Sequence, residues 1–341
     1  MPSINIQKIS EDLLQTLPKR AREVLESRFG IGKAKERKTL EAIGSSYGIT
    51  RERVRQIESY ALNKLRLHEV MKENQSVFQE LKNELEKHGG IAEEENFLAT
   101  LAKDPREKNH VRFLLTLSGD FMRLKEDDEF NHRWTTSREL AEAAHGTLRS
   151  LHSHLEEKQE PVSEKEIKEK ISEIGRSALG HDLQEPAITS WLSLSKKLGR
   201  NKLGEWGLSE SSHISPRGVR DSAYLVMRHH GSPLHFSEVA AAIRKNLGEK
   251  AHVQTVHNEL IKDDRFVLVG RGLYALKEWG YKPGIVRDVI KNILVSSGPL
   301  AKDKLIERVL KERYVKPSTI KINLQQKKYF RVLEDGRYTV V

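Results

Sequence analysis

The stretch from Leu17 to Arg66 constrains the fold of this chain most strongly. Leu40 and Ile43 give a short helix one apolar face, and Gly48 permits a sharp turn after it. Thr50 can cap a second helix. The buried stripe of that helix follows helical spacing: Val54, Ile57, Ala61, Leu62 and Leu65. A short helix, a glycine turn and a second helix predict a helix-turn-helix.

Another helix is expected just before this motif. Pro18 suits its first turn, where a missing N–H costs nothing. Its apolar positions are Ala21, Val24, Leu25 and Phe29. Gly30 and Gly32 are expected to end it.

The second helix of the motif carries side chains suited to base edges on its outward face, namely Arg51, Glu52, Arg55 and Gln56. Arginine pairs with guanine, glutamine with adenine, and glutamate with the amino group of cytosine. These residues occupy the N-terminal turns, the part of a recognition helix that enters the major groove. A merely solvated charged face is the alternative interpretation.

The segments LPKRAREVLESRFG and TLEAIGSSYGITRERVRQIESYALNKLR resemble region 4 of the bacterial sigma-70 family, continuously from Leu17 to Arg66. The resemblance implies binding to the promoter −35 element and to the β flap of RNA polymerase core. It also implies base readout by Arg51, Glu52, Arg55 and Gln56, and phosphate contacts by Thr39 and Arg53. A sigma factor carries this region last, after a segment that melts DNA. Here it comes first and no aromatic-rich melting segment is found, so full sigma activity is not expected.

The composition is that of a polar protein with several small cores, with 37% hydrophobic and 32% charged residues. No apolar run approaches membrane-spanning length, and the N-terminus lacks a signal peptide pattern. The absence of cysteine excludes disulfides and thiolate metal sites, and it fits a reducing cytoplasm. We therefore expect a cytoplasmic protein without membrane contact.

The net charge of +10 is concentrated at the two ends of the chain. It is +5 in residues 1–70, −3 in residues 71–281 and +8 in residues 282–341. Basic surfaces attract the phosphate backbone without selecting sequence. The acidic middle argues against the whole chain lying on DNA.

A repeat runs through the rest of the sequence and is clearest in its last two copies. Phe266 lies 11 positions after Thr255, as Phe330 does after Thr319, and Tyr274 lies 8 positions after Phe266, as Tyr338 does after Phe330. Each copy predicts a helix, a strand, a glycine turn and a returning strand, which is a winged helix. The expected fold is thus mainly α with small β-hairpin wings.

The predicted domains are the helix-turn-helix in 1–70 and four winged-helix units in 76–135, 136–210, 216–281 and 283–341. Capping boxes from Thr136 to Glu139 and from Ser163 to Glu166 are expected to open helices of the second unit. Ser237 is expected to cap a helix of the third unit. That third unit, residues 220–279, resembles the HARE-type helix-turn-helix of the RNA polymerase delta subunit through GSPLHFSEVA, TVHNEL and DDRFVLVGRGLYAL.

The C-terminal unit is expected to contact phosphate rather than bases. Its candidate residues lie on or near the third helix and the wing: Lys316, Lys321, Lys327, Lys328 and Arg337. The use of the third helix and the wing is an analogy from architecture.

No catalytic, cofactor or small-molecule site is expected. Gly30-Ile31-Gly32-Lys33 lacks the spacing of a phosphate-binding loop, since Ala34 follows the lysine. His152 and His154 are two residues apart on a predicted helix and point apart, so no metal site is expected. Three hypotheses stay open: a DNA-binding transcription regulator, a polymerase-binding accessory factor without sequence readout, and a nucleic-acid enzyme or its subunit. The sequence contains no motif that supports the third.

Overall fold

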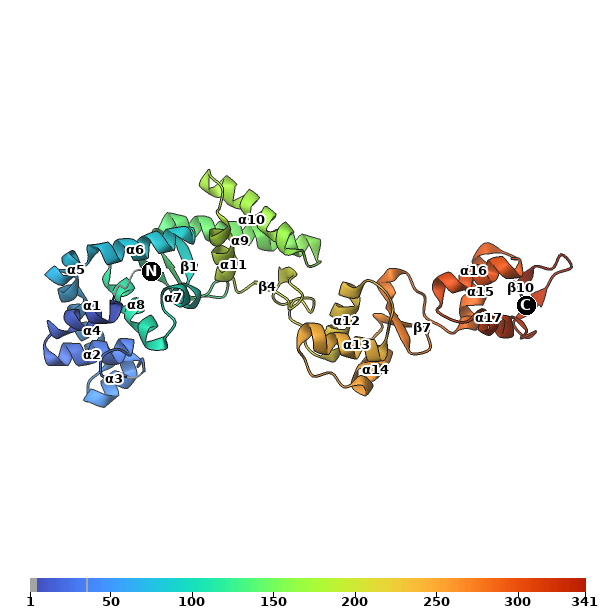
Figure 1. The fold of residues 1–341 in the computed structure, drawn as a ribbon, viewed down its shortest axis with the longest axis horizontal. Coiled ribbons are helices and arrows are strands. Elements are labelled where there is room, and N and C mark those ends of the chain that lie inside the picture. Colours follow the sequence, from blue (N-terminus) through green and yellow to red (C-terminus); the bar gives the residue numbers. More distant parts are fainter. Residues whose placement is uncertain (1–4, 35) are drawn as a thin grey trace. The chain divides into compact units, whose positions relative to one another are not determined.

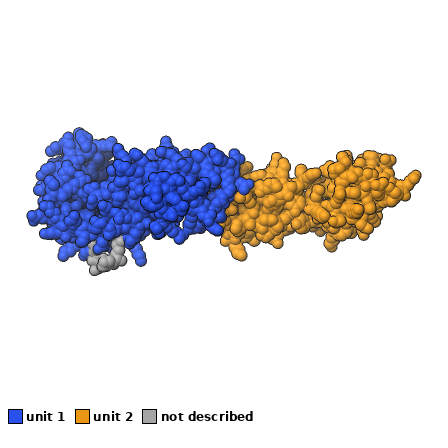
Figure 2. Space-filling view, turned by 90° about the horizontal axis from the view of Figure 1, so that it is seen from above, with its two compact units in different colours: residues 1–199 blue, residues 200–341 orange. Residues whose placement is uncertain are grey.

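The computed structural model describes residues 5–34 and 36–341, which form a mainly helical protein with small antiparallel sheets. This confirms the expected fold class. The chain divides into two compact units, residues 1–199 and 200–341 (Figure 2). The domain boundaries expected within each unit stay predictions.

The first unit begins with two helices, continues with the predicted helix-turn-helix of α3 and α4, and is followed by a helical segment with a three-stranded sheet (Figure 1). In order, the elements are α1 (Ile6–Gln15), α2 (Lys19–Phe29), α3 (Leu40–Tyr47), α4 (Arg51–Arg66), α5 (Glu69–Glu73), α6 (Gln75–Lys87), β1 (Ile91–Glu93), α7 (Glu94–Leu101), α8 (Pro105–Leu117), β2 (Met122–Leu124) and β3 (Arg133–Thr135). The sheet has the antiparallel order β1-β3-β2.

Helix α1 was not anticipated from the sequence. The side chain of Asn5 caps it by accepting from the backbone N–H of Lys8 at 2.9 Å. Ile6, Ile9 and Leu13 lie on its inner face, and Leu13 is fully buried. This spacing and cap were the available signal for the helix.

The helix-turn-helix shares its hydrophobic core with the segment that follows it. Phe29 of α2 meets Phe113 of α8 edge to face, with ring centroids 5.1 Å apart. Arg66, the last residue of α4, donates to the backbone carbonyls of Leu117 at 3.2 Å and Thr116 at 3.0 Å. These carbonyls end α8 and need partners there. Helix α8 is therefore joined to α2 by aromatic packing and to α4 by hydrogen bonds.

Three further helices complete most of the first unit: α9 (Arg138–Lys158), α10 (Glu164–Leu179) and α11 (Glu185–Leu194). Helix α11 packs on β1, where Ser190 Oγ donates to the carbonyl of Ile91 at 3.1 Å. The ring of Trp191 is fully buried beside it. These helices thus extend the core around the first three-stranded sheet.

The predicted cap at Thr136 is wrong by one residue. Ser137 caps α9 by accepting from the N–H of Leu140 at 3.1 Å. The hydroxyl of Thr135 accepts from the N–H of Ser137, which fixes the start of the helix one residue later than expected. The cap at Ser163 is confirmed, since its hydroxyl accepts from the N–H of Glu166 at 3.2 Å.

A short hairpin of β4 (Leu198–Arg200) and β5 (Trp206–Leu208) follows. The next elements are α12 (Val219–His230), β6 (Leu234–His235), α13 (Phe236–Ala242), the π-helical turn η1 (Ile243–Leu247), α14 (Val253–Lys262), β7 (Phe266–Gly270), β8 (Leu273–Leu276) and the 3₁₀ turn η2 (Lys277–Trp279). The sheet order is β6-β8-β7. This succession of three helices and a hairpin is the predicted one; the resemblance to the HARE-type module stays a prediction.

The predicted cap at Ser237 is also wrong. Helix α13 begins at Phe236, because the imidazole of His235 accepts from the N–H of Ser237. In return, the carboxylate of Glu238 accepts from the N–H of His235 at 2.8 Å. The sequence rule missed this cap because histidine is not a favoured capping residue.

The last elements repeat the pattern: α15 (Val286–Ser297), α16 (Lys302–Glu312), α17 (Pro317–Leu324), β9 (Phe330–Val332) and β10 (Tyr338–Val340). Phe266 and Phe330 each begin a strand, and each faces the residue ten positions later across the hairpin. Leu234 pairs with Tyr274 as Leu300 pairs with Tyr338. The repeat inferred from the 11-and-8 spacing is confirmed at these positions.

Within the described ranges, none of the helices is both long and apolar enough to cross a membrane.

Candidate nucleic-acid interface

The turn between α3 and α4 is tight and is built from small residues and caps. A Cβ on Gly44 of α3 would lie 2.6 Å from the carbonyl oxygen of Ile49. Any side chain at this position would clash with the turn, so the close approach requires glycine. Gly48 ends α3 in the left-handed conformation at φ 64°. Thr50 then caps α4 by accepting from the N–H of Arg53 at 3.2 Å, as the sequence predicts.

Buried side chains fix the rotation of α4 against its neighbours. Val54 of α4, Ile43 of α3 and Val24 of α2 are fully buried and pack together. Arg28 of α2 donates to Glu58 of α4 at 3.2 Å. These contacts decide which side of α4 faces solvent.

The candidate base-reading residues are all exposed in the first two turns of α4, namely Arg51, Glu52, Arg55 and Gln56, and so is the phosphate-contact candidate Arg53. Four of these five side chains form two hydrogen-bonded pairs. Arg55 donates twice to Glu52, and Nη1 of Arg53 donates to Oε1 of Gln56 at 3.1 Å. The hydrogen bonds and charge of Arg55 hold the pKa of the Glu52 carboxyl below its usual value. An ordered, charged and hydrogen-bonding surface therefore stands at the N-terminus of α4.

Thr39 has a structural role that leaves a donor available. Its side-chain oxygen caps α3 by accepting from the N–H of Ala42 at 3.1 Å. A hydroxyl that accepts one hydrogen bond can still donate its own proton. Thr39 and Thr50 thus each stand at a helix N-terminus, where an anion is favoured.

With this geometry in view, comparison with known proteins assigns the segment. Residues 13–67 match the family model "Sigma-70, region 4". Over 56 residues the chain is 54% identical to the RNA polymerase sigma factor SigA of a Bacillus species. Residues 13–67 form a sigma-70 region 4 domain.

The match is confined to the beginning of the chain. The aligned stretch is 16% of this chain and spans 15% of the length of the SigA relative. In this chain the region 4 domain continues into α5 to α8, whose side chains complete its core. The sequence did not signal this joint core, because Phe29 and Phe113 are far apart along the chain.

The basic residues predicted in the C-terminal segment are all exposed: Lys316, Lys321, Lys327, Lys328 and Arg337. Lys316 precedes α17, Lys321 lies on it, and Lys327 and Lys328 lie in the turn that leads to β9. Arg337, in the turn before β10, donates to Asp335 at 2.6 Å, so part of its charge is compensated. Their role in phosphate contact stays a prediction.

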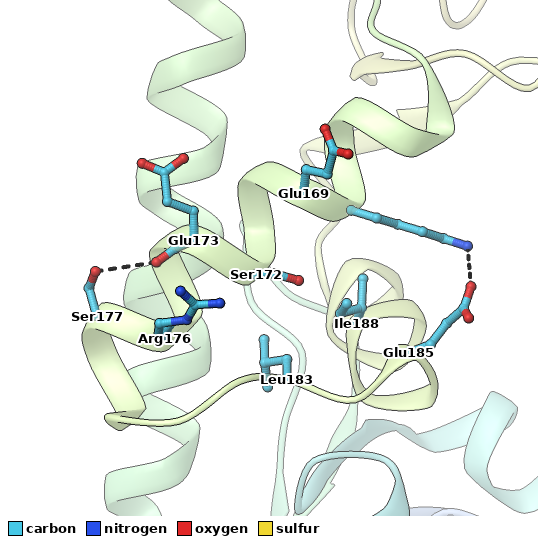
Figure 3. Close-up of a pocket in the computed structure, with 9 residues that line it drawn as sticks. Glu169, Ser172, Glu173, Arg176, Ser177, Leu183, Glu185 and Ile188 are labelled. Atoms are coloured by element: carbon cyan, nitrogen blue, oxygen red, sulfur yellow. Dashed lines mark hydrogen bonds and ion pairs between the residues drawn. The ribbon is translucent and has the colours of Figure 1, made fainter.

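A shallow groove of about 750 Å³ lies between α10 and α11 and does not resemble a catalytic site (Figure 3). Leu183 and Ile188 lie between the two helices at its centre, and Glu169 and Glu173 point away from them. On its rim, Nζ of Lys168 donates to Glu185 at 2.7 Å. Since the groove is open and its rim charges form ion pairs, we assign no chemistry to it.

Side chains suited to metal binding are dispersed. Within residues 5–34 and 36–341, no three His, Asp or Glu side chains gather in a way that could hold a metal ion.

Proposed function

We propose that this chain is a DNA-binding transcription regulator of the bacterial type, whose region 4 domain recognises duplex DNA resembling the promoter −35 element. The observation that carries the proposal is the exposed N-terminal face of α4. It presents Arg51, Glu52, Arg55 and Gln56 on a helix whose rotation is set by buried packing. These side chains can discriminate base edges in the major groove.

The second part of the proposal concerns RNA polymerase. The similar protein from Bacillus carries the name RNA polymerase sigma factor, and its similarity covers the whole region 4 domain. We propose that this chain contacts RNA polymerase core, through the β flap, and acts without catalysing a reaction. Such a regulator works in the cytoplasm, where bacterial DNA is transcribed.

Titration of the purified full chain with two labelled duplexes tests the proposal. One duplex carries a −35-like element, and the other has the same composition in scrambled order. The proposal expects tighter binding of the first duplex at every salt concentration. Equal affinities, combined with capture of core polymerase, would favour the alternative of an accessory factor without sequence readout.

A further inference from the structure

The connection between η2 and α15, residues 280–285, is held by a buried arginine from the C-terminal segment. Arg313, at the end of α16, has only 2% of its surface exposed. Its Nη2 donates to the carbonyls of Lys282 and, at 3.2 Å, of Gly284. Its Nη1 donates to the carbonyl of Glu312 at 2.7 Å. Because Lys282 and Gly284 lie in the connection, Arg313 fixes its course.

The three acceptors of Arg313 are backbone carbonyls, and none of them is a carboxylate. Burial lowers the pKa of its guanidinium, whereas the charge of Glu312 raises it. A buried charge costs free energy unless hydrogen bonds compensate it. A planar guanidinium can donate to two carbonyls at once in a fixed geometry. Arg313 is therefore suited to hold two backbone positions in place.

The residue that follows Arg313 pairs with the edge of the β7–β8 hairpin. The N–H of Tyr314 donates to the carbonyl of Val269 at 2.8 Å, and Tyr314 forms a parallel β-bridge with Gly270. A Cβ on Gly270 would lie 2.8 Å from the carbonyl oxygen of Tyr314. The two backbones thus touch at a point where only glycine allows this approach.

A small apolar cluster supports this contact from the hairpin side. Trp279 and Tyr281 pack against three buried residues of the hairpin: Val267, Val269 and Ala275. Tyr281 directly precedes Lys282, whose carbonyl accepts from Arg313. The hairpin, the connection and the end of α16 are therefore joined by packing and by hydrogen bonds.

Two earlier hairpins are joined to later segments in a similar way. The N–H of Asn131, in the turn between β2 and β3, donates to the carbonyl of Leu194 at 2.9 Å. Nζ of Lys202, in the turn between β4 and β5, donates to the carbonyl of Leu247 at 2.5 Å. Hairpins of this chain thus repeatedly serve to hold neighbouring segments together.

The contact at Tyr314 lies next to a predicted phosphate-binding residue. Lys316 follows Tyr314 by two positions and is the N-cap residue of α17. Val315, between them, packs against the hydrophobic core of the C-terminal segment. The position at which the hairpin holds Tyr314 therefore also fixes the start of α17.

We propose that Arg313 and Tyr314 form a joint that makes the segment from α12 to η2 and the C-terminal segment move as one body, and so positions the lysines of α17 for duplex DNA. Both are positioning residues and touch no DNA. A joint that is already ordered spares the conformational entropy of ordering the connection when DNA binds. The DNA part of this inference rests on the proposed function, whereas the joint does not depend on it.

Pulsed electron paramagnetic resonance on the full chain tests the joint. The chain has no cysteine, so spin labels attach only to two introduced at exposed positions, His229→Cys on α12 and Lys304→Cys on α16. We expect a narrow distance distribution in the labelled protein and a broad one after Gly270→Ala, whose methyl group would displace Tyr314. Gly146→Ala, on α9, adds a methyl group in open space and should keep the distribution narrow.

A second variant acts on the joint from the C-terminal segment. Arg313→Lys keeps the charge, but an ammonium lacks the planar geometry that holds two carbonyls, so we expect the same broadening. If Arg313→Lys lowers the melting temperature, Gly270→Ala decides, because it lies outside the C-terminal segment and its φ is not positive. A broad distribution in the labelled protein without further changes would overturn the joint, and so would a narrow one after Gly270→Ala.

Affinity for a long specific duplex, measured with the unlabelled variants, tests the positioning of the lysines. We expect Gly270→Ala to weaken binding by about 5- to 30-fold, the cost of ordering the backbone of one connecting residue, with an unchanged preferred sequence. Gly146→Ala should bind as the wild type does. Gly270→Ala should have no further effect in a protein that carries Gln in place of four lysines: Lys316, Lys321, Lys327 and Lys328.

The two measurements separate the possible failures. A broadened distance distribution with unchanged affinity would leave the joint in place and show that it does not position the lysines. Equal weakening by Gly270→Ala with and without the four lysines would also contradict the positioning role. A wild-type protein that prefers no duplex overturns the proposed function, whereas the distance measurement still decides whether the joint exists.

Discussion

Arg55 and Glu52 bind one another on the exposed face of α4. Nε of Arg55 donates to Oε2 of Glu52 at 2.8 Å, and Nη2 donates to Oε1 at 2.7 Å. Both side chains are 58% exposed, and exposed ion pairs contribute little to stability. The pair orders two base-reading candidates in the free protein and can give way to base edges when DNA binds.

We predict that Arg55→Ala weakens binding to a specific duplex by about 10- to 100-fold, because alanine cannot form the bidentate hydrogen bonds that arginine makes with a base. Preference should relax at one base pair and stay intact at the others. Competition between duplexes that differ at single positions measures both effects. Equal weakening of specific and random DNA binding would show that Arg55 contacts only the backbone.

Replacement of the buried carboxylate Glu94 should loosen the segment next to the region 4 domain. Glu94 is buried and pairs with Arg112 of α8 and Arg123 of β2, so Glu94→Gln leaves the buried Arg112 with only the exposed Glu95 as a charge partner. Breaking a buried pair costs about 3–5 kcal/mol. Hydrogen exchange of the α7 and α8 amides should accelerate accordingly. Glu95→Gln, at an exposed position beside it, is the matched control and should change exchange much less.

The imidazole of His145 is expected to stay neutral well below pH 6. Burial lowers its pKa to about 4, and the charges of Arg133 and Arg149 act in the same direction. Nε of Arg133 donates to Nε2 of His145 at 2.8 Å, which requires an unprotonated acceptor. An NMR titration of His145 should show a midpoint near 4; a midpoint at the ordinary value of about 6.5 would contradict this geometry.

The same shift makes the first unit sensitive to acid. The pKa of His145 in the unfolded chain is about 6.5, above its folded value, so the unfolded state binds a proton first. The stabilising contribution of neutral His145 is complete above that pH and declines as the pH falls toward its folded pKa. His145→Asn should flatten the pH dependence of unfolding in that window.

The C-terminal lysines are expected to bind phosphate without adding sequence preference. Joint replacement of Lys316, Lys321, Lys327 and Lys328 by Gln should lower the salt slope by about 0.9 for each phosphate that these lysines neutralise in the wild type. Substitution is preferable to deletion of residues 283–341, because the N–H of Tyr314 donates to the carbonyl of Val269 at 2.8 Å. An unchanged slope would assign this surface to another partner.

Local signals were sufficient for most elements of the fold. Gly48 and Thr50 marked the turn of the helix-turn-helix, and the spacing of Phe330 and Tyr338 marked a wing. They failed by one or two residues at Ser137 and His235, where the helix cap depends on side-chain hydrogen bonds across a few residues.

The contacts between distant segments could not be predicted from the sequence. The packing of Phe29 on Phe113 and the hydrogen bonds from Arg66 to the end of α8 join residues far apart in the chain. The candidate site shows the same contrast between features that a local sequence pattern predicts and contacts between distant segments. The residues on α4 were identified from one helix, whereas the packing that sets the rotation of α4 joins Val24, Ile43 and Val54 from three helices.

Selection of DNA fragments by the purified full chain tests the central claim most directly. Random genomic fragments are bound, washed and sequenced, with and without RNA polymerase core, for wild type and for a variant with Arg55→Ala and Gln56→Ala. The account predicts one short common motif in the wild-type fragments, absent from those of the variant. Wild-type fragments without a common motif, or the same motif from the variant, would contradict base readout by α4.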